Sequence, residues 1–257
     1  LFLAPLVPDT KLLEEKIPQA DYIFVTDSHF DHFMDVPPIA LRTGAKVVGS
    51  ATAAKLLRLF KVPESQIIEV KGGETLRAGP FTVKAALAEH GRILFIPPFY
   101  GDIARESRPP LYVWEYANLD NRCYHFTTDG FSFFATSGTG LDEKVMREFK
   151  ADLAMVNVTA LPEGYIRKLI SLTSPQVVFP THYDNYFEPY ARGVAPWPFL
   201  GAGIMRDIEE SAPGAAVVTL DFFQEYRVRI PFRVSDPAVP AVPETAEKRM
   251  FEKTNRH

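Results

Sequence analysis

The chain has 257 residues, a formal net charge of −4 at pH 7 and 46% hydrophobic residues. This length and apolar content predict a globular protein with a substantial core, as one large α/β domain or two small ones. Lys and Arg are scattered rather than clustered, which argues against nucleic acid as a partner. A single cysteine, Cys123, excludes an internal disulfide and a cysteine-rich metal site. It favours a reducing compartment, with the cytoplasm as the default expectation.

Membrane association is not expected from the sequence. No run of about twenty apolar residues is long enough to span a bilayer. The apolar start LFLAPL is too short and lacks a basic leader.

The first part of the chain predicts alternating strands and helices. Residues 20–25, ADYIFV, indicate a buried strand because polar turn formers bound an apolar run. A short polar loop follows it. The pattern then predicts a short helix, a strand and a second helix with Ser50 as N-cap, over residues 37–43, 44–50 and 50–62.

From Gln66 to residue 90, apolar and polar residues alternate between glycine-rich turns, which is typical of short antiparallel strands. Residues 96–110 are rich in proline and charge and predict a long loop. Further strands are predicted over 111–118, 122–130, 131–138, 151–158 and 175–184, and helices over 141–149 and 162–173.

The domain prediction follows from this order of elements. Sheets covered by helices are expected over residues 1–230, as a single domain. The tail, residues 231–257, loses periodicity and contains repeated prolines, so we expect an extended C-terminal segment.

The stretch VTDSHFDH, residues 25–32, concentrates ligand-type side chains at the end of the first predicted strand. Asp27, His29, Asp31 and His32 follow its carboxyl end, where α/β folds place ligands. Imidazole and carboxylate are the ligands that Zn²⁺ takes when no thiolate is available. Two buried carboxylates without a cation are costly or force one to protonate. The stretch therefore predicts a metal site, with a solvated polar turn as the alternative.

Two further predicted strands end in a histidine, at His90 and at His182, and a third ends in the small-residue turn from Ser137 to Gly140. Either histidine taken alone is more often structural. Their positions at strand ends, in this order along the chain, favour a shared site with residues 25–32. His125 alternates with aromatic neighbours and is interpreted as a strand residue.

The order and context of these motifs resemble the metallo-β-lactamase superfamily, and most closely its branch of sugar-lactone and phosphodiester hydrolases. That family carries Thr-His-x-His-x-Asp-His after a strand, a lone histidine near the place of His90, a Gly-Asp-Thr-Gly turn and a final strand ending in Pro-x-His. The resemblance covers Leu1 to about Asp184. It implies an α/β fold, an αββα sandwich of two mixed β-sheets flanked by helices, with its first strands upstream of Leu1.

Two departures from the family pattern affect the implied metal ligands. Asp27 stands where the family has its first histidine, and Gly138 stands where it has an aspartate that bridges two metals. The total of two carboxylates is kept, but one has moved to the first site. We therefore expect weakened or single metal occupancy, with the second site better preserved. Carried over residue by residue, the first site comprises Asp27, His29 and His90, and the second Asp31, His32 and His182.

The resemblance implies a metal-dependent hydrolase that acts on an ester, lactone or phosphodiester through a metal-bound hydroxide. Asp31 is the expected catalytic residue, orienting the nucleophile and accepting its proton. The expected cofactor is one or two divalent ions, most simply zinc, with manganese or iron as alternatives. The expected partner is a small-molecule substrate with an anionic group, for which Tyr183 and Arg92 are candidate contacts.

Two other functions remain open from the sequence. A non-catalytic member of the fold with a decayed metal site is one, because both departures fall on ligand positions. An iron-dependent oxidoreductase is the other, because histidine and carboxylate ligands also suit iron and O₂ chemistry. The sequence is also compatible with a homo-oligomer.

Overall fold

The computed structural model describes residues 3–90, 101–159, 161–184, 193 and 202–228. The chain divides into one unit from Leu1 to Arg227 and a second from Val228 to His257. Apart from Val228, the second unit lies outside the described residues. The expected extended tail over 231–257 therefore stays a prediction.

The described residues of the first unit form two β-sheets. In the smaller sheet the order is β1-β2-β3 and both pairings are parallel, with strands Tyr22–Phe24, Lys46–Gly49 and Ile67–Glu69. The larger sheet is mixed and has the order β10-β9-β8-β7-β6-β5-β4. Its pairings are antiparallel from β4 to β7 and parallel from β7 to β10. These strands are β4 (Thr75–Ala78), β5 (Phe81–Ala88), β6 (Asn121–Thr128), β7 (Phe131–Thr136), β8 (Leu153–Asn157), β9 (Val177–Thr181) and β10 (Ala216–Val217).

The helices fall into two groups along the chain. Those before the larger sheet are α1 (Thr10–Lys16), α2 (Phe30–Phe33), α3 (Val36–Thr43), α4 (Ala51–Leu59) and the 3₁₀ turn η1 (Glu64–Gln66). Those after its first strands are the 3₁₀ turn η2 (Val113–Glu115), α5 (Glu143–Glu148), α6 (Tyr165–Thr173) and α7 (Ala202–Ser211). Among the described helices, none combines the length and apolar character needed to cross a bilayer.

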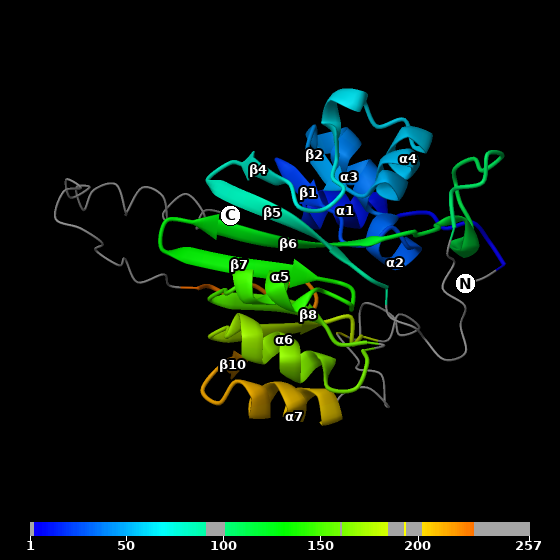
Figure 1. Cartoon of the computed structure of the whole chain (residues 1–257). Helices are drawn as coiled ribbons and strands as arrows, with labels where there is room; N and C mark the ends of the chain where they lie inside the picture. Colours follow the sequence, from blue (N-terminus) through cyan, green and yellow to red (C-terminus); the bar gives the residue numbers. More distant parts are fainter. Residues whose placement is uncertain (1–2, 91–100, 160, 185–192, 194–201, 229–257) are drawn as a thin grey trace, which may run out of the picture. The chain divides into compact units, whose positions relative to one another are not determined.

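Three buried clusters of side chains lie between the layers of helices and strands that Figure 1 draws. The first joins α3 and α4 to the smaller sheet, through residues such as Leu56 and Val47. The second lies between the sheets, where the Phe24 ring meets Tyr124 edge-on at 5.1 Å. The third joins α5, α6 and α7 to the larger sheet, through residues such as Leu169 and Val156. The layers follow the order helix, sheet, sheet, helix, which confirms the expected fold class.

Local sequence signals account for several element ends. The Ser50 hydroxyl accepts a hydrogen bond from the Ala53 backbone N at 3.3 Å and caps α4, as predicted. Gly44 ends α3 in the left-handed conformation, with φ 78°, which glycine adopts without a steric penalty. These two ends fix the helices that cover the smaller sheet.

The prediction of a strand over 111–118 is wrong, because these residues contain η2 and loop. The Glu115 carboxylate accepts hydrogen bonds from the Tyr112 backbone N at 2.9 Å and from the Ser107 hydroxyl at 2.8 Å. Capping of this kind favours a helical turn over a strand.

The direction of β3 also differs from expectation. Residues 67–69 pair in parallel with β2 instead of belonging to an antiparallel set. Their apolar pattern indicates a strand but does not specify its partner, and α4 is the crossover that makes the parallel pairing. The expected loop over 96–110 forms no helix or strand in its described part, residues 101–110.

Candidate metal centre

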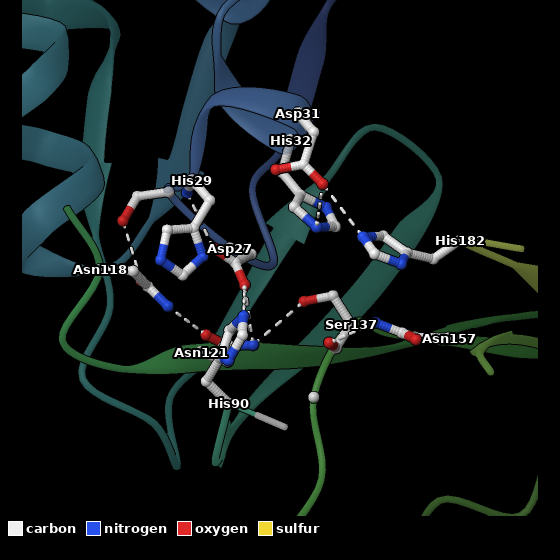
Figure 2. Close-up of polar contacts among 12 residues, drawn as sticks. Asp27, His29, Asp31, His32, His90, Asn118, Asn121, Ser137, Asn157 and His182 are labelled. Atoms are coloured by element: carbon white, nitrogen blue, oxygen red, sulfur yellow. Dashed lines mark hydrogen bonds and ion pairs between the residues drawn. The ribbon is translucent and has the colours of Figure 1, made fainter. Parts of the chain in front are cut away.

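The first cluster of ligand-type side chains surrounds Asp27, which follows β1. Its side chain is 0% exposed. Atom Oδ1 accepts a hydrogen bond from the His29 backbone N at 2.8 Å and lies 2.9 Å from His29 Nδ1. Atom Oδ2 lies 3.4 Å from His90 Nε2. We call Asp27, His29 and His90 the first triad (Figure 2).

The second cluster joins the short helix α2 to the end of β9. Asp31 Oδ2 lies 3.0 Å from His182 Nε2 and 3.5 Å from His32 Nε2. The two imidazole rings stack with centroids 5.0 Å apart and an interplanar angle of 7°. The residues expected in a loop thus include one helical turn, which carries Asp31 and His32. We call Asp31, His32 and His182 the second triad.

The structure brings together the same two sets of residues that the family pattern assigns to two metal sites. In each set, one ligand atom from each residue lies within 4.8 Å of the others. Each triad offers one carboxylate and two imidazoles, which is a suitable donor set for a divalent transition-metal ion. The residues present therefore fit such an ion in chemistry and in spacing, and their role as metal ligands remains a proposal.

Electrostatics keep both carboxylates ionised. Burial raises the pKa of Asp27, but the hydrogen bond from His29 and the charges of the neighbouring histidines outweigh it, so the pKa lies below its usual value. The pKa of Asp31 is lowered in the same way, chiefly by the hydrogen bond from His182 against the effect of burial. An ionised carboxylate in each triad is the form that binds a cation.

Backbone geometry supports the position of His182. Its φ is 62°, in the left-handed region that a non-glycine residue seldom adopts. The Thr159 hydroxyl donates a hydrogen bond to the His182 carbonyl oxygen. Asn157, at the end of β8, accepts a hydrogen bond from the Thr159 backbone N at 2.7 Å and donates to the Ser137 carbonyl oxygen at 2.7 Å. The ends of β7, β8 and β9 are thereby held together beneath the second triad.

Gly138 occupies a place with no room for a side chain. A Cβ there would lie 2.3 Å from the Glu89 carbonyl oxygen and 3.0 Å from Asn121 Nδ2. In this backbone, position 138 therefore has no space for the bridging aspartate of the family pattern. The preceding residue, Ser137, instead directs its hydroxyl toward Asn121, at 3.4 Å from Nδ2 (Figure 2).

Sequence reasoning gave no role to the buried asparagines around the site. Asn118, Asn121 and Asn157 each make hydrogen bonds with residues next to the triads or with triad members. No spacing or motif marks them, because asparagine is common at strand ends and turns. Only the folded arrangement distinguishes them.

The remaining sequence candidates have different surroundings. Tyr183 packs against the cluster that joins α5, α6 and α7 to the larger sheet, and its hydroxyl donates to the Leu220 carbonyl oxygen at 3.4 Å. Arg92 lies outside the described residues. The substrate-binding roles of both residues stay predictions. His125 lies on β6 with Nε2 2.9 Å from the Lys150 carbonyl oxygen, so its interpretation as a strand residue is confirmed.

Comparison with known proteins adds named relatives. A UPF0173 metal-dependent hydrolase of Staphylococcus aureus (strain N315) is 27% identical over 207 residues, which cover 77% of this chain and 82% of the relative. The structure of Igni18, a metallo hydrolase from the archaeon Ignicoccus hospitalis, is similar with TM-score 0.55 and 18% identity, covering 81% of this chain and 80% of that one. The metallo-β-lactamase fold protein YhfI from Bacillus subtilis matches with TM-score 0.52 and 13% identity, covering 78% and 74%.

A family model covers most of the chain. The model described as "Beta-lactamase superfamily domain" matches residues 3–183, which include both triads. This chain therefore belongs to the metallo-β-lactamase superfamily.

Proposed function

We propose that this protein is a metal-dependent hydrolase that cleaves an ester, lactone or phosphodiester bond in a small anionic substrate. The observation that carries the proposal is the convergence of two Asp-His-His triads from distant parts of the chain. The S. aureus relative, which is named a metal-dependent hydrolase, supports the reaction class. The lactone and phosphodiester substrates come from the resemblance of the motifs alone.

One or two divalent ions are the proposed cofactor, with zinc first because imidazole and carboxylate donors suit it. When bound, such an ion supplies a Lewis acid and a source of hydroxide at neutral pH. Asp27, His29 and His90 would hold one ion, and Asp31, His32 and His182 the other.

Asp31 is the proposed catalytic carboxylate because of its access to solvent. Its side chain is 18% exposed, whereas that of Asp27 is 0% exposed. A water molecule can therefore approach Asp31, which would orient it and accept its proton during attack on the substrate. Asp27 would act only in binding.

The test of the proposal is metal content and turnover in the parent protein and in His182→Ala. Suitable probes are a p-nitrophenyl ester, a simple lactone and bis(p-nitrophenyl) phosphate, which separate the three substrate classes. We expect the parent to retain a divalent ion and to cleave at least one probe, and His182→Ala to lose the second-triad ion and turnover. His125→Gln, which replaces a histidine outside both triads, is the matched control. Parent-level turnover in His182→Ala would end the assignment.

An iron-dependent oxidoreductase is the second candidate, favoured by the donor composition of each triad. One carboxylate and two imidazoles with open positions also suit Fe(II) and O₂ chemistry. A coloured preparation that contains iron and cleaves none of the three probes would favour it over hydrolysis.

A further inference from the structure

A chain of hydrogen bonds leads through the protein interior to the first triad. The Ser28 hydroxyl has two possible acceptors, Asn118 Oδ1 and the Ala117 carbonyl oxygen, each at 2.8 Å, and Asn118 Nδ2 donates to Asn121 Oδ1. Asn121 Nδ2 then donates to Asp27 Oδ2 at 3.2 Å. Ser28, Asn118, Asn121 and Asp27 are all buried, with exposed fractions from 0 to 2%. Figure 2 shows both asparagines directed along this path.

The hydrogen bonds fix the orientation of both amides, and so decide which end of Asn121 faces Asp27. Because Asn118 uses its nitrogen toward Asn121, its oxygen faces the Ser28 hydroxyl. Asn121 in turn accepts with its oxygen and must present its nitrogen, a donor, to the carboxylate. A flipped Asn121 amide would place two oxygens against each other in a buried place, which is costly. The chain therefore presents a donor to Asp27 in a fixed direction.

Asn121 donates to one oxygen of the Asp27 carboxylate, and the His29 backbone N donates to the other. The second side-chain torsion of aspartate has broad preferences, so its plane is set by its partners. Oδ1 is held by the His29 backbone N at 2.8 Å, and Oδ2 by Asn121 at 3.2 Å. Besides the triad imidazoles, each oxygen thus has one further hydrogen-bond donor, and the carboxylate plane places Oδ1 near His29 Nδ1 and Oδ2 near His90 Nε2.

Different residues support the second triad. The His182 carbonyl oxygen accepts from the Thr159 hydroxyl, and Thr159 in turn is held by Asn157. The contact of Asn121 on that side of the site is with the Ser137 hydroxyl, at 3.4 Å. Removing the Asn121 amide therefore acts first on Asp27.

We propose that Asn121 is a positioning residue that holds the Asp27 carboxylate toward His29 and His90, so that the affinity of the first triad for a divalent ion depends on the Asn121 amide. The inference rests on the proposed function, because it takes the triads as metal sites. It assigns to Asn121 a role in one triad and none in the other.

The experiment isolates each triad and then removes the Asn121 amide. His182→Ala leaves the first triad intact, and His90→Ala leaves the second. Asn121→Ala is added to each, and Zn²⁺ binding is measured by isothermal titration calorimetry on all four proteins. In the His182→Ala background we expect roughly a 10- to 100-fold loss of affinity, the usual effect of removing a residue that orients a ligand. In the His90→Ala background we expect a change within about twofold, because the hydrogen bonds of Asn121 join it to Asn118, Asp27 and Ser137, none of which belongs to the second triad.

Two controls separate positioning from loss of stability. Gln66→Ala removes another buried amide, which donates to the Ala40 and Ala45 carbonyl oxygens at 2.8 and 2.9 Å, away from the triads. We expect it to lower the thermal midpoint without changing Zn²⁺ affinity. Asn118→Ala leaves Asn121 in place but removes its support, and a smaller loss at the first triad is expected. If Asn121→Ala does not fold, Asn118→Ala takes its place in the test.

The outcomes distinguish this inference from the proposed function. Three results would overturn the inference: an unchanged Zn²⁺ affinity of the first triad after loss of the Asn121 amide, an equal loss of affinity at both triads, or no Zn²⁺ binding by the first triad in His182→Ala. In each of these cases, a parent protein that binds metal leaves the proposed function standing. A parent protein that binds no Zn²⁺ at either triad would overturn both.

Discussion

His182 Nε2 lies 3.0 Å from Asp31 Oδ2, although the two residues are 151 positions apart in the sequence. Asp31 lies on α2, which follows the first strand of the smaller sheet, and His182 follows β9 of the larger sheet. Their contact depends on the packing of one sheet on the other. The second triad therefore forms only when that packing is complete.

Replacing Asp31 by asparagine tests its role in proton transfer. The amide has nearly the same shape as the carboxylate but cannot accept a proton from water, so turnover of the cleaved probe should fall by about 10²- to 10⁴-fold. Steady-state kinetics, together with metal analysis of the variant, measure this. Asp129→Asn, which changes an exposed aspartate in the turn between β6 and β7, is the matched control. Turnover by Asp31→Asn equal to that of the control would remove Asp31 from the mechanism.

Dialysis against a chelator tests the expected weak occupancy. Because Gly138 provides no carboxylate to share between two ions, fewer than two equivalents of metal should remain after dialysis. Elemental analysis measures the content before and after. Two equivalents retained firmly would contradict this expectation.

Adding the metal back should raise the thermal midpoint. An ion that binds only the folded state stabilises it by about 2.7 kcal/mol when its free concentration is 100 times Kd. Differential scanning calorimetry with and without added Zn²⁺ checks this, and His182→Ala should show a smaller increase. An equal increase in parent and variant would place the stabilising ion outside the second triad.

Gly138→Ala tests the close contact next to the site. Its Cβ would lie 2.3 Å from a backbone oxygen, so the chain must shift, and we expect a loss of about 1–3 kcal/mol in the free energy of unfolding, as in overpacked interiors. Gly203→Ala is the control, because a Cβ at this position in α7 meets no atom within 4 Å. In a helix that change should be neutral or stabilising by up to about 1 kcal/mol. Urea denaturation compares the two, and equal stabilities would show that position 138 has room for a side chain.

His125 should make the protein less stable in mild acid. Burial lowers the pKa of His125 in the folded state, although the Lys150 carbonyl oxygen partly opposes this. The unfolded chain then binds a proton more readily, with an ordinary pKa of about 6.5, so stability falls as the pH drops below about 6.5 toward the lowered folded value. Above about 6.5 this penalty is absent.

The measurement is the difference between pH 7.5 and pH 5 in the free energy of unfolding, for the parent and for His125→Gln. His182 contributes with the opposite sign because its pKa is raised, by the hydrogen bond and charge of Asp31 against the effect of burial. Therefore only the comparison of this pH-dependent difference between the parent and His125→Gln reports on His125. We expect His125→Gln to lose less free energy of unfolding between pH 7.5 and pH 5 than the parent does. Equal losses in the two proteins would contradict a lowered pKa of His125 in the folded state.

Local sequence patterns predicted most of the regular elements, because helix caps and apolar runs act over a few residues. Ser50 and Gly44 mark real helix ends. The strand predicted over 111–118 is wrong because hydrogen bonds from Tyr112 and Ser107 to the Glu115 carboxylate determine a turn there. An apolar run shows that a segment is buried but does not show which partner its backbone finds.

The sequence by itself determined the kinds of ligand-type side chain in this protein and their places at the ends of elements. The resemblance to a known family supplied their grouping into two triads. Only the tertiary structure decided what holds Asp27 in place and why position 138 carries no carboxylate. The physical reason is that the Asn121 amide and the Glu89 carbonyl oxygen reach those positions through the packing of separate strands. Contacts of this kind leave no periodic or motif signal along the chain.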